Sequence, residues 1–304
     1  MKTNGLQRKP AFGAPRLLIL GCGDVGMRLL PLLRAHFRVF ALTSSRERFA
    51  QLRHAGAVPI LGDLDQAHSL PRLARLARLI VHLAPPQAEG ERDLRTRRLS
   101  AILPEGARLV YVSTTGVYGN CHGAHISETQ ATAPVNARAR RRVDAEQVLR
   151  AWAVRSGSRL SILRVPGIYA ADRLPIERLQ RGTPALLAQD DVFTNHIHAD
   201  DLARIIRLAL TRGAPQRVYH AVDDSDLKMG DYFDLVADTH GLPRPPRLPR
   251  SQLAQQVTPM MLSFMSESRR LSNARLKQEL GVRLRWPDVE SFLRQTSLKP
   301  PNTP

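Results

Sequence analysis

Short apolar runs alternate with longer amphipathic stretches through the first half of the chain. The runs that predict β-strands are 16–20, 38–42, 58–61, 79–83 and 108–113. The stretches between them that have the length and spacing of crossover helices are 25–35, 46–54, 70–76 and 92–103. This alternation predicts βαβ units around a parallel sheet that is buried on both faces. The expected fold class is therefore α/β, with a doubly wound parallel sheet.

The second half of the chain first continues the sheet. A long helix is predicted at 135–154, and strands follow at 160–165 and 217–222. Because both strands can extend the same sheet, we expect the sheet domain to cover 16–170 and to be completed by 192–222.

A smaller lobe is expected from the pieces that remain, 171–191 and 223–298. Helical patterns at 232–239 and 268–280 predict that this lobe is mainly α-helical, and the Pro-rich stretch 242–249 interrupts it. The segments expected to be flexible are the two ends, 1–15 and 299–304.

The first predicted strand leads directly into a glycine-rich loop. Residues 21–26 read Gly-Cys-Gly-Asp-Val-Gly, which is the spacing G-x-G-x-x-G between a buried strand and an amphipathic helix. Gly21 permits the tight turn, Gly23 lets a pyrophosphate approach the backbone, and Gly26 allows the helix to pack closely on the strand. The N–H groups at the helix start, at Asp24 and Val25, would face the phosphates. The loop therefore predicts a Rossmann-type site for a nicotinamide dinucleotide.

The end of the second predicted strand bears on which dinucleotide is bound. NAD-selective sites place a carboxylate there, which accepts hydrogen bonds from the ribose hydroxyls. This chain instead has Thr43, Ser44, Ser45 and Arg46, with Arg48 two residues further on. Either arginine could pair with the 2′-phosphate of NADP, or it could be a solvated helix residue. The pattern favours NADP, with NAD as the alternative.

Asp63 and Leu64 follow the third predicted strand. A carboxylate at this place can accept a hydrogen bond from the adenine amino group, or it can cap the next helix. The sequence leaves both roles of Asp63 open.

Several motifs, read in chain order, resemble those of the extended short-chain dehydrogenases/reductases. Besides the glycine loop, the segments that carry the resemblance are Gly62-Asp63-Leu64, Val81-His82-Leu83-Ala84-Pro85, Val112-Ser113-Thr114-Thr115-Gly116-Val117-Tyr118-Gly119, Leu163-Arg164-Val165-Pro166-Gly167-Ile168-Tyr169 and Asn195-His196-Ile197-His198-Ala199-Asp200-Asp201-Leu202-Ala203. The resemblance implies a Rossmann fold and a bound NAD or NADP. The residues that it places beside the cofactor are Leu83, Ala84, Pro85, Pro166 and Tyr169, and those that it makes the active-site hydroxyls are Ser113, Thr114 and Thr115.

The helix after the fifth strand departs from the family pattern. Typical members carry there a tyrosine and a lysine four residues apart on one helix face, often with a glutamate four residues further on. Aligning that glutamate with Glu146 puts Arg142 at the lysine position and Arg138 at the tyrosine position. Arginine stays protonated, so Arg138 cannot act as the general acid/base, whereas Arg142 could still bind the nicotinamide ribose. The chain therefore resembles atypical members, which bind the cofactor without the usual tyrosine and lysine.

Two tyrosines could replace the missing proton donor. Tyr118 stands beside the hydroxyls of Ser113, Thr114 and Thr115, and Tyr169 lies in the loop after the sixth strand. Each tyrosine could equally be a packed ring with a bonded hydroxyl. The three smaller hydroxyls could polarise a substrate carbonyl, or they could bond the backbone at the strand end.

His196 and His198 alternate on one strand face and precede Asp200 and Asp201, an arrangement that could suggest a metal. Zinc needs three or four converging ligands. Capping of a helix at 202–210 by either aspartate explains these carboxylates without a metal. We therefore predict no metal site.

Composition limits the remaining classes of function. Hydrophobic residues make up 43% of the 304 residues, which is enough for an ordinary globular core. The formal charge of +18 would suit nucleic acid, but the arginines are scattered, and no zinc-finger, RNP or basic-zipper pattern accompanies them. No apolar run has the length of a membrane span or a signal peptide, and Cys22 and Cys121 form no disulfide framework. We expect a cytoplasmic protein with a solvated basic surface and no membrane partner.

Two functions fit these expectations. The first is an NADP-dependent oxidoreductase or epimerase/dehydratase-like enzyme that acts on a small molecule held between the cofactor and the C-terminal lobe. The second is a non-catalytic NAD(P)-binding module for redox sensing or regulation. Arg138 and Arg142 would suit that module, but they would also suit an anionic substrate. Binding of nucleic acid is a third and weaker hypothesis.

The sequence does not identify the substrate or the assembly. Arg269, Arg270 and Asn273 are expected on a helix of the C-terminal lobe, where they could face substrate or solvent. A helical face of the sheet domain could support a homodimer.

Overall fold

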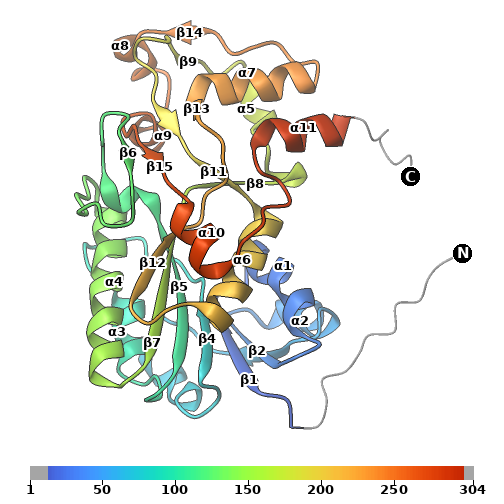
Figure 1. Ribbon diagram of the computed structural model, residues 1–304, viewed down its shortest axis with the longest axis vertical. Coiled ribbons are helices and arrows are strands. Elements are labelled where there is room, and N and C mark those ends of the chain that lie inside the picture. The colour runs from blue at the N-terminus through green and yellow to red at the C-terminus, as the bar shows by residue number, and fades with distance from the viewer. Residues whose placement is uncertain (1–12, 298–304) are drawn as a thin grey trace, which may run out of the picture. The chain divides into compact units, whose positions relative to one another are not determined.

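The computed structural model describes residues 13–297 of the chain (Figure 1). The expected flexible tail, and all but residues 13–15 of the expected flexible N-terminal segment, lie outside the described residues. Contacts divide the chain into two compact units. The first unit comprises the described residues up to Ser113 together with Asn136–Arg164 and Leu202–Tyr219, and the second comprises Thr114–Val135, Val165–Asp201 and the described residues from His220 onward.

The first unit is built on a seven-stranded sheet with the order β12-β7-β5-β4-β1-β2-β3. Its strands are β1 (Arg16–Leu20), β2 (Arg38–Thr43), β3 (Val58–Leu61), β4 (Leu79–His82), β5 (Arg108–Thr114), β7 (Arg159–Val165) and β12 (Arg217–His220). The pairs β4–β5, β4–β1, β1–β2 and β2–β3 are parallel. The expected doubly wound parallel sheet is confirmed.

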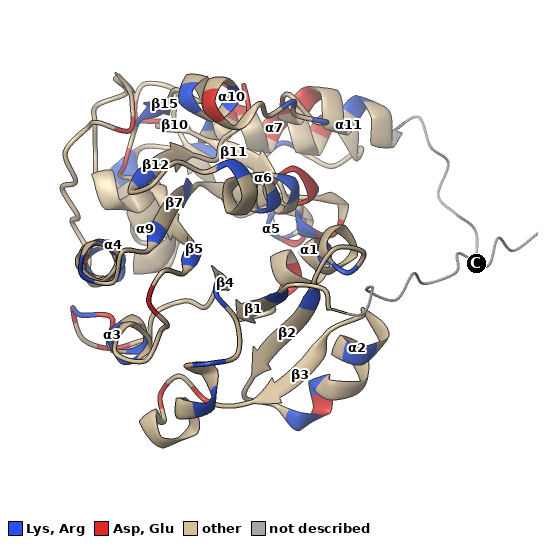
Figure 2. Ribbon diagram, turned by 60° about the horizontal axis from the view of Figure 1, so that its bottom comes forward, with Lys and Arg blue, Asp and Glu red and all other residues tan. Residues whose placement is uncertain are grey.

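Helices cover both faces of this sheet, with α3 and α4 on one face and α1, α2 and α6 on the other (Figures 1 and 2). The helices are α1 (Asp24–Leu33), α2 (Phe49–His54), α3 (Leu94–Ser100), α4 (Ala137–Arg155) and α6 (Ala199–Arg212), and the 3₁₀ turns are η1 (Arg46–Arg48), η2 (Ala67–Ser69) and η3 (Pro71–Leu73). Leu17, Leu18, Ile19 and Leu20 are fully buried. Each such side chain contributes about 1.5–3 kcal/mol to folding, which is why a strand without polar alternation lies at the centre of the sheet.

Two of the expected helices are wrong. The stretch 70–76 contains only the 3₁₀ turn η3, which begins at Pro71 and follows η2. The stretch 268–280 begins as a strand, β15 (Arg270–Leu271), whose backbone bonds go to β6 (His125–Ile126), and becomes helical only in α10 (Ala274–Leu280). Pairing with a distant strand replaced the local helical preference there, so Arg269 and Arg270 lie in an extended segment.

The second unit contains short helices and four two-stranded pairings among the described residues. Its further elements are η4 (Thr115–Tyr118), β8 (Gly167–Tyr169), η5 (Ala171–Arg173), α5 (Ile176–Gln180), β9 (Ala185–Leu186), β10 (Phe193–Thr194), β11 (His196–His198), β13 (Leu227–Lys228), α7 (Met229–Thr239), β14 (Arg247–Leu248), α8 (Arg250–Leu253), α9 (Pro259–Phe264) and α11 (Val289–Ser297). Its apolar core gathers Tyr169, Tyr232, Phe233, Trp286 and Phe292. The domain boundaries expected at 170, 192 and 222 stay predictions.

Two surface properties can be stated for the described part of the chain. No helix between residues 13 and 297 combines the length and apolarity that a bilayer crossing requires. Lysine and arginine are spread over the helices and loops of both units (Figure 2).

Candidate functional site

The glycine loop leaves β1 at the carboxyl edge of the sheet. Gly21 has a φ of +82°, in the left-handed region, and a Cβ there would lie 2.6 Å from backbone atoms of Ala84. A Cβ at Gly26 would lie 2.9 Å from the Sγ of Cys22 and 3.4 Å from a methyl carbon of Leu83. Both glycines are therefore required by the fold itself, the first for the turn and the second for close packing.

Gly23 differs from these two glycines, because the fold has room for a side chain there. Apart from Gly23 itself and its two chain neighbours, no atom of the described residues lies within 4 Å of a Cβ built on Gly23, and its φ of −79° is open to any residue. Gly23 is the N-cap of α1 and accepts a hydrogen bond from the Met27 N–H at 2.9 Å. An α-helix cannot satisfy the N–H groups of its own first turn. The open space and the helix N-terminus together fit a phosphate group.

The charged groups around the loop also suit an anion. Asp24, at the start of α1, accepts a hydrogen bond from the Nε of Arg28 at 3.0 Å, which offsets its negative charge. Burial raises the pKa of the Cys22 thiol to about 11, although the nearby positive charge of Arg48 opposes this rise. Cys22 is thus a neutral thiol at pH 7, and Arg48 adds positive charge beside the loop.

The end of β2 reaches the same edge of the sheet as the glycine loop, because β1 and β2 are parallel. Thr43 is buried, and its hydroxyl accepts a hydrogen bond from the Ser45 N–H at 3.3 Å. Ser44 and Arg46 are exposed, and η1 begins at Arg46. A hydroxyl and a guanidinium are therefore open to solvent where β2 ends.

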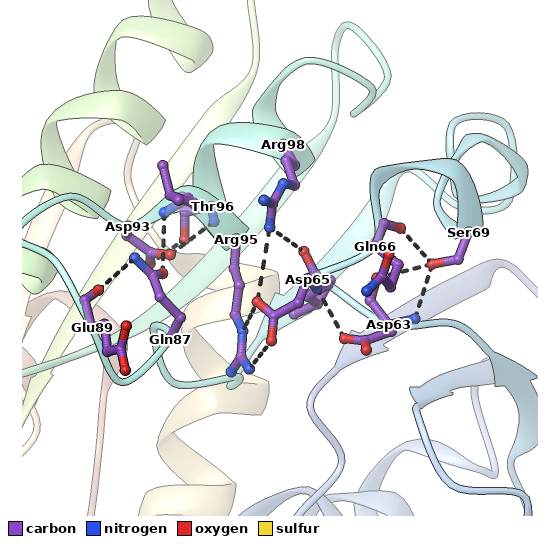
Figure 3. Close-up of polar contacts among 12 residues, drawn as sticks. Asp63, Asp65, Gln66, Ser69, Gln87, Glu89, Asp93, Arg95, Thr96 and Arg98 are labelled. Atoms are coloured by element: carbon purple, nitrogen blue, oxygen red, sulfur yellow. Dashed lines mark hydrogen bonds and ion pairs between the residues drawn. The ribbon is translucent and has the colours of Figure 1, made fainter.

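The turn after β3 is shaped by Asp63 (Figure 3). Its carboxylate accepts a hydrogen bond from the Asp65 N–H at 2.9 Å, and its own N–H donates to the hydroxyl of Ser69 at 3.0 Å. The next helical residue is Ala67, and Gln66 is its N-cap. The helix-capping alternative for Asp63 is therefore wrong, because the carboxylate bonds a turn and no helix begins there. Leu64, next in the chain, is buried.

The end of β4 holds the glycine loop in place. The N–H groups of Leu83 and Ala84 both donate to the carbonyl of Leu20, at 2.8 and 3.0 Å. This contact brings the backbone of Ala84 against Gly21. Pro85, next in the chain, is exposed.

A buried polar chain behind this edge was not expected from the sequence. The Nε2 of His82 lies 3.0 Å from the hydroxyl of Thr96, and that hydroxyl donates to a carboxylate oxygen of Asp93 at 2.7 Å. Since Thr96 uses its own proton on Asp93, His82 must carry its proton on Nε2. Burial, followed by the charges of Arg142 and Arg95, lowers the pKa of His82 to about 3. His82 is therefore neutral in the folded protein.

This neutral histidine predicts a pH dependence of stability. The unfolded chain takes up a proton near pH 6.5, whereas folded His82 does not until about pH 3. Below pH 6.5 the unfolded state therefore binds one more proton than the folded state, and the free energy of unfolding falls by up to about 1.4 kcal/mol per pH unit. In urea unfolding between pH 7 and 5, His82→Gln should flatten the pH slope, and the exposed control His54→Gln should not. Equal slopes for wild type and His82→Gln would contradict the account.

Two further residues of the predicted site lie near the end of β5 in the first unit. Ser113 is fully buried, and its hydroxyl has no hydrogen-bond partner between residues 13 and 297. The Nη1 of Arg142, on α4, donates to the hydroxyl of Tyr111 and to the carbonyl of Val112, both at 3.0 Å. These bonds fix the guanidinium beside β5. Arg138, one turn earlier on α4, is exposed.

In the second unit, an ion pair that was not expected from the sequence contacts Thr115, the residue directly after β5. Arg269 is buried, Glu267 is half-buried, and the two side chains bond each other at 2.8 Å. Arg269 also donates to the carbonyl of Gly119 at 2.7 Å, and its other terminal nitrogen lies 3.5 Å from the hydroxyl of Thr115. Thr114, which precedes Thr115, is half-buried. Glu267 and Arg269 carry no motif in the sequence, and only the β15–β6 pairing brings them here.

The two candidate tyrosines are both buried in the second unit. The hydroxyl of Tyr118 lies 2.5 Å from the Nε2 of His220, whose Nδ1 lies 3.0 Å from the carbonyl of Ser272. Since a carbonyl only accepts, Nδ1 carries the histidine proton, and the Tyr118 hydroxyl donates to Nε2. This geometry is that of a packed ring with a bonded hydroxyl.

Tyr169 packs edge-on against three rings, those of His196, His198 and Phe292. Burial, and then the carboxylate of Asp223, raise the pKa of Tyr169 far above its usual value. Burial also raises the pKa of Asp223 to about 7. Tyr169 therefore holds its proton at every physiological pH.

The histidines of β11 do not form a metal site in the part of the chain that the structure describes. β11 pairs in parallel with β8, the strand that begins directly after the half-buried Pro166. Burial lowers the pKa of His196, on β11, to about 4. Asp201 accepts hydrogen bonds from the N–H groups of Arg285 and Trp286, at 3.0 and 2.9 Å. Because α6 already begins at Ala199, the expected capping of a helix at 202–210 is wrong.

Fold and loop together define a doubly wound α/β protein of Rossmann type, in which the glycine loop lies at the point where the strand order reverses between β4 and β1. The sequence model of the family described as "RmlD substrate binding domain" matches residues 16–286, and the chain belongs to this family. No curated protein matches the chain.

Solved structures give the same fold. A functionally unknown conserved protein from Silicibacter pomeroyi is 28% identical, with a TM-score of 0.76, over 93% of this chain and 98% of that chain. The UDP-glucose 4-epimerase of Thermotoga maritima, solved with UDP-glucose, is 18% identical, with a TM-score of 0.73, over 93% and 97% of the two chains. The dTDP-glucose 4,6-dehydratase of Streptomyces venezuelae, solved with NAD and TYD, is 21% identical, with a TM-score of 0.71, over 92% and 95%.

Proposed function

We propose that this chain binds NADP at the glycine loop and is an oxidoreductase or epimerase/dehydratase-like enzyme of the atypical short-chain dehydrogenase/reductase type. The observation that carries the proposal is Gly23. The folded chain has room for a side chain at this position, so a glycine there is explained by a ligand that approaches the backbone. The helix N-terminus at Gly23 makes a pyrophosphate the fitting ligand.

The residues that would hold the rest of the dinucleotide line one edge of the sheet. Thr43, Ser44 and Arg46 would bind the ribose that carries the 2′-phosphate. Asp63, with Leu64, would meet the adenine. Leu83, Ala84 and Pro85 follow β4 at the same edge, and Arg142, Pro166 and Tyr169 are assigned to the nicotinamide half through the family resemblance.

Cofactor choice is tested by titrating the protein with NADP⁺ and NAD⁺. We expect tighter binding of NADP⁺, because positions 43–46, where NAD-selective sites place a carboxylate, hold none. Arg46→Ala should weaken NADP⁺ binding about five- to thirtyfold and leave NAD⁺ binding unchanged, since a charge-assisted bond to phosphate contributes about 1–2 kcal/mol. Arg53→Ala, at an exposed position of α2, is the matched control. Tighter binding of NAD⁺ that Arg46→Ala does not alter would contradict the assignment.

The bound nicotinamide would supply hydride transfer. The chain's own part is to place a substrate oxygen and to donate hydrogen bonds to it, for which Ser113, Thr114 and Thr115 provide hydroxyls. Arg138 and Arg142 cannot exchange protons at neutral pH. The Tyr118 hydroxyl is bonded to His220 and the Tyr169 hydroxyl is buried, so the hydroxyls of Ser113, Thr114 and Thr115 are the favoured hydrogen-bond donors to a substrate oxygen.

Structural relatives support nucleotide sugars as the first substrates to try, because an epimerase and a dehydratase of this fold were solved with UDP-glucose and with TYD. NADPH consumption or sugar epimerisation is measured against a panel of nucleotide sugars and simple carbonyls. Thr115→Val should abolish turnover, whereas Tyr118→Phe and Tyr169→Phe should retain it. Turnover that survives Thr115→Val and is lost in Tyr169→Phe would show that Tyr169, and not Thr115, acts on the substrate oxygen.

The second candidate is a non-catalytic NAD(P)-binding module. It is favoured by the two arginines that stand where typical members keep their tyrosine and lysine. Cofactor binding without turnover of any substrate in the panel would support this candidate over the enzyme.

A further inference from the structure

Arg95 joins two loops that lie three strands apart in the sheet (Figure 3). Its Nε and Nη2 donate to the two carboxylate oxygens of Asp65, at 2.8 and 2.5 Å, and its Nη1 donates to the carbonyl of Pro85 at 3.0 Å. Asp65 belongs to the loop after β3, and Pro85 belongs to the loop after β4. One side chain thus fixes both loops, and we call this arrangement the Arg95 brace.

A second arginine of α3 supports the brace. Arg98, one helical turn after Arg95, donates to the carbonyl of Leu64 at 3.1 Å and lies 3.8 Å from the carboxylate of Asp65. The bond from Arg95 holds the pKa of Asp65 below its usual value. The carboxylate therefore stays ionised at neutral pH and keeps both arginines in place.

The strand order determines what lies between the two loops. β1 and β2 separate β4 from β3, so the loops start about 14 Å apart. The loops after β3 and β4 can both reach Arg95 only at the carboxyl edge of the sheet. The glycine loop and residues 43–46 lie at the same edge. The brace therefore closes one side of the edge to which the adenosine half of the dinucleotide is assigned.

Fold stability alone is a weak reason for this arrangement. The side chains of Arg95 and Asp65 are 24% and 40% exposed, and ion pairs at such positions contribute about 0–1 kcal/mol to stability. A planar guanidinium that bonds a carboxylate and a carbonyl at the same time does, however, fix the geometry of the two loops. Loops that are ordered before the ligand binds raise its affinity, because binding then costs less conformational entropy.

We propose that Arg95 is a positioning residue for the adenosine half of the bound dinucleotide, acting through Asp65 and the carbonyl of Pro85. It touches neither adenine nor phosphate itself. This inference rests on the proposed binding of NADP at the glycine loop. It adds that affinity for the adenosine half depends on a side chain of α3 outside the cofactor motifs.

The chain offers a matched control on the same helix. Arg97, two residues after Arg95, pairs with Asp144 of α4, where its Nε lies 3.1 Å from the carboxylate. It therefore forms a comparable ion pair but contacts neither loop. Arg97→Met removes one charge from α3 and leaves the brace intact.

The test measures binding of NADP⁺, of adenosine 2′,5′-bisphosphate and of nicotinamide mononucleotide by calorimetry. Arg95→Met should weaken the first two by up to about fivefold and leave the third unchanged. Arg97→Met should change none of them, and Arg95→Lys should give an intermediate loss. The melting temperatures of Arg95→Met and Arg97→Met should agree within a few degrees.

The possible failures can be told apart. If wild type binds NADP⁺ and Arg95→Met binds the adenosine bisphosphate as tightly as Arg97→Met does, the positioning role is overturned and the proposed function stands. If all three ligands weaken equally in Arg95→Met, the residue acts on folding and the positioning role is again overturned. If wild type binds neither NADP⁺ nor NAD⁺, the proposed function fails and the brace inference fails with it.

Discussion

Gly23→Asp should weaken NADP⁺ binding more than about a hundredfold, which corresponds to about 2.7 kcal/mol, while leaving the chain folded. Aspartate is a favoured N-cap residue, and a Cβ at Gly23 meets nothing within 4 Å apart from its chain neighbours. The same carboxylate would stand where the pyrophosphate has to approach the helix N-terminus. Affinity and stability should therefore separate in this variant.

Neutral substitutions divide this effect into its steric and electrostatic parts. Gly23→Asn has nearly the size of aspartate but no charge, and Gly23→Ala adds one carbon. We expect the affinity for NADP⁺ to fall in the order Ala, Asn, Asp, with unfolding free energies within about 1 kcal/mol of wild type. Binding by Gly23→Asp at wild-type affinity would show that no phosphate approaches the loop.

Glu146→Ala should lower the free energy of unfolding by about 3–5 kcal/mol, the range found when one partner of a buried ion pair is removed. Glu146 on α4 accepts hydrogen bonds from the Nε and Nη2 of Arg164 on β7, at 3.1 and 2.6 Å, and both side chains are buried. Removing the carboxylate takes this ion pair away from a guanidinium that is buried in the protein. The change is measured by urea unfolding at pH 7.

An apolar replacement of the whole pair is the control for this prediction. Glu146→Leu combined with Arg164→Met should lose much less stability than Glu146→Ala, because no charge is then buried. If the free energy of unfolding of Glu146→Ala lies within about 1 kcal/mol of that of wild type, the pair does not anchor α4 to the sheet.

The first half of the fold could be predicted from sequence because its signals are local. The apolar runs of β1 to β5 are continuous, and the glycine loop lies directly between a strand and a helix. At Gly21 and Gly26 the structure gives the physical reasons that the motif implies, a positive φ and a close contact. The Rossmann-type sheet and its candidate cofactor edge therefore followed from residues near one another in the chain.

The rest could not be predicted because it depends on contacts between distant residues. Arg269 reaches Thr115 across 154 residues of sequence, and Arg95 reaches Asp65 across 30. The helix expected at 268–280 failed for the same reason, since its first part pairs with β6. Helix capping was one of the two roles left open for Asp63 and was expected of Asp200 or Asp201, yet the carboxylates of Asp63 and Asp201 accept backbone N–H groups elsewhere.

A crystal structure of the chain with NADP⁺ would show whether the dinucleotide lies on the glycine loop. We expect pyrophosphate oxygens within about 3 Å of backbone nitrogens in the first turn of α1, next to Gly23, and the 2′-phosphate beside Arg46. A dinucleotide bound elsewhere, or a side chain or ordered loop filling the space at Gly23 while NADP⁺ is bound, would contradict this expectation.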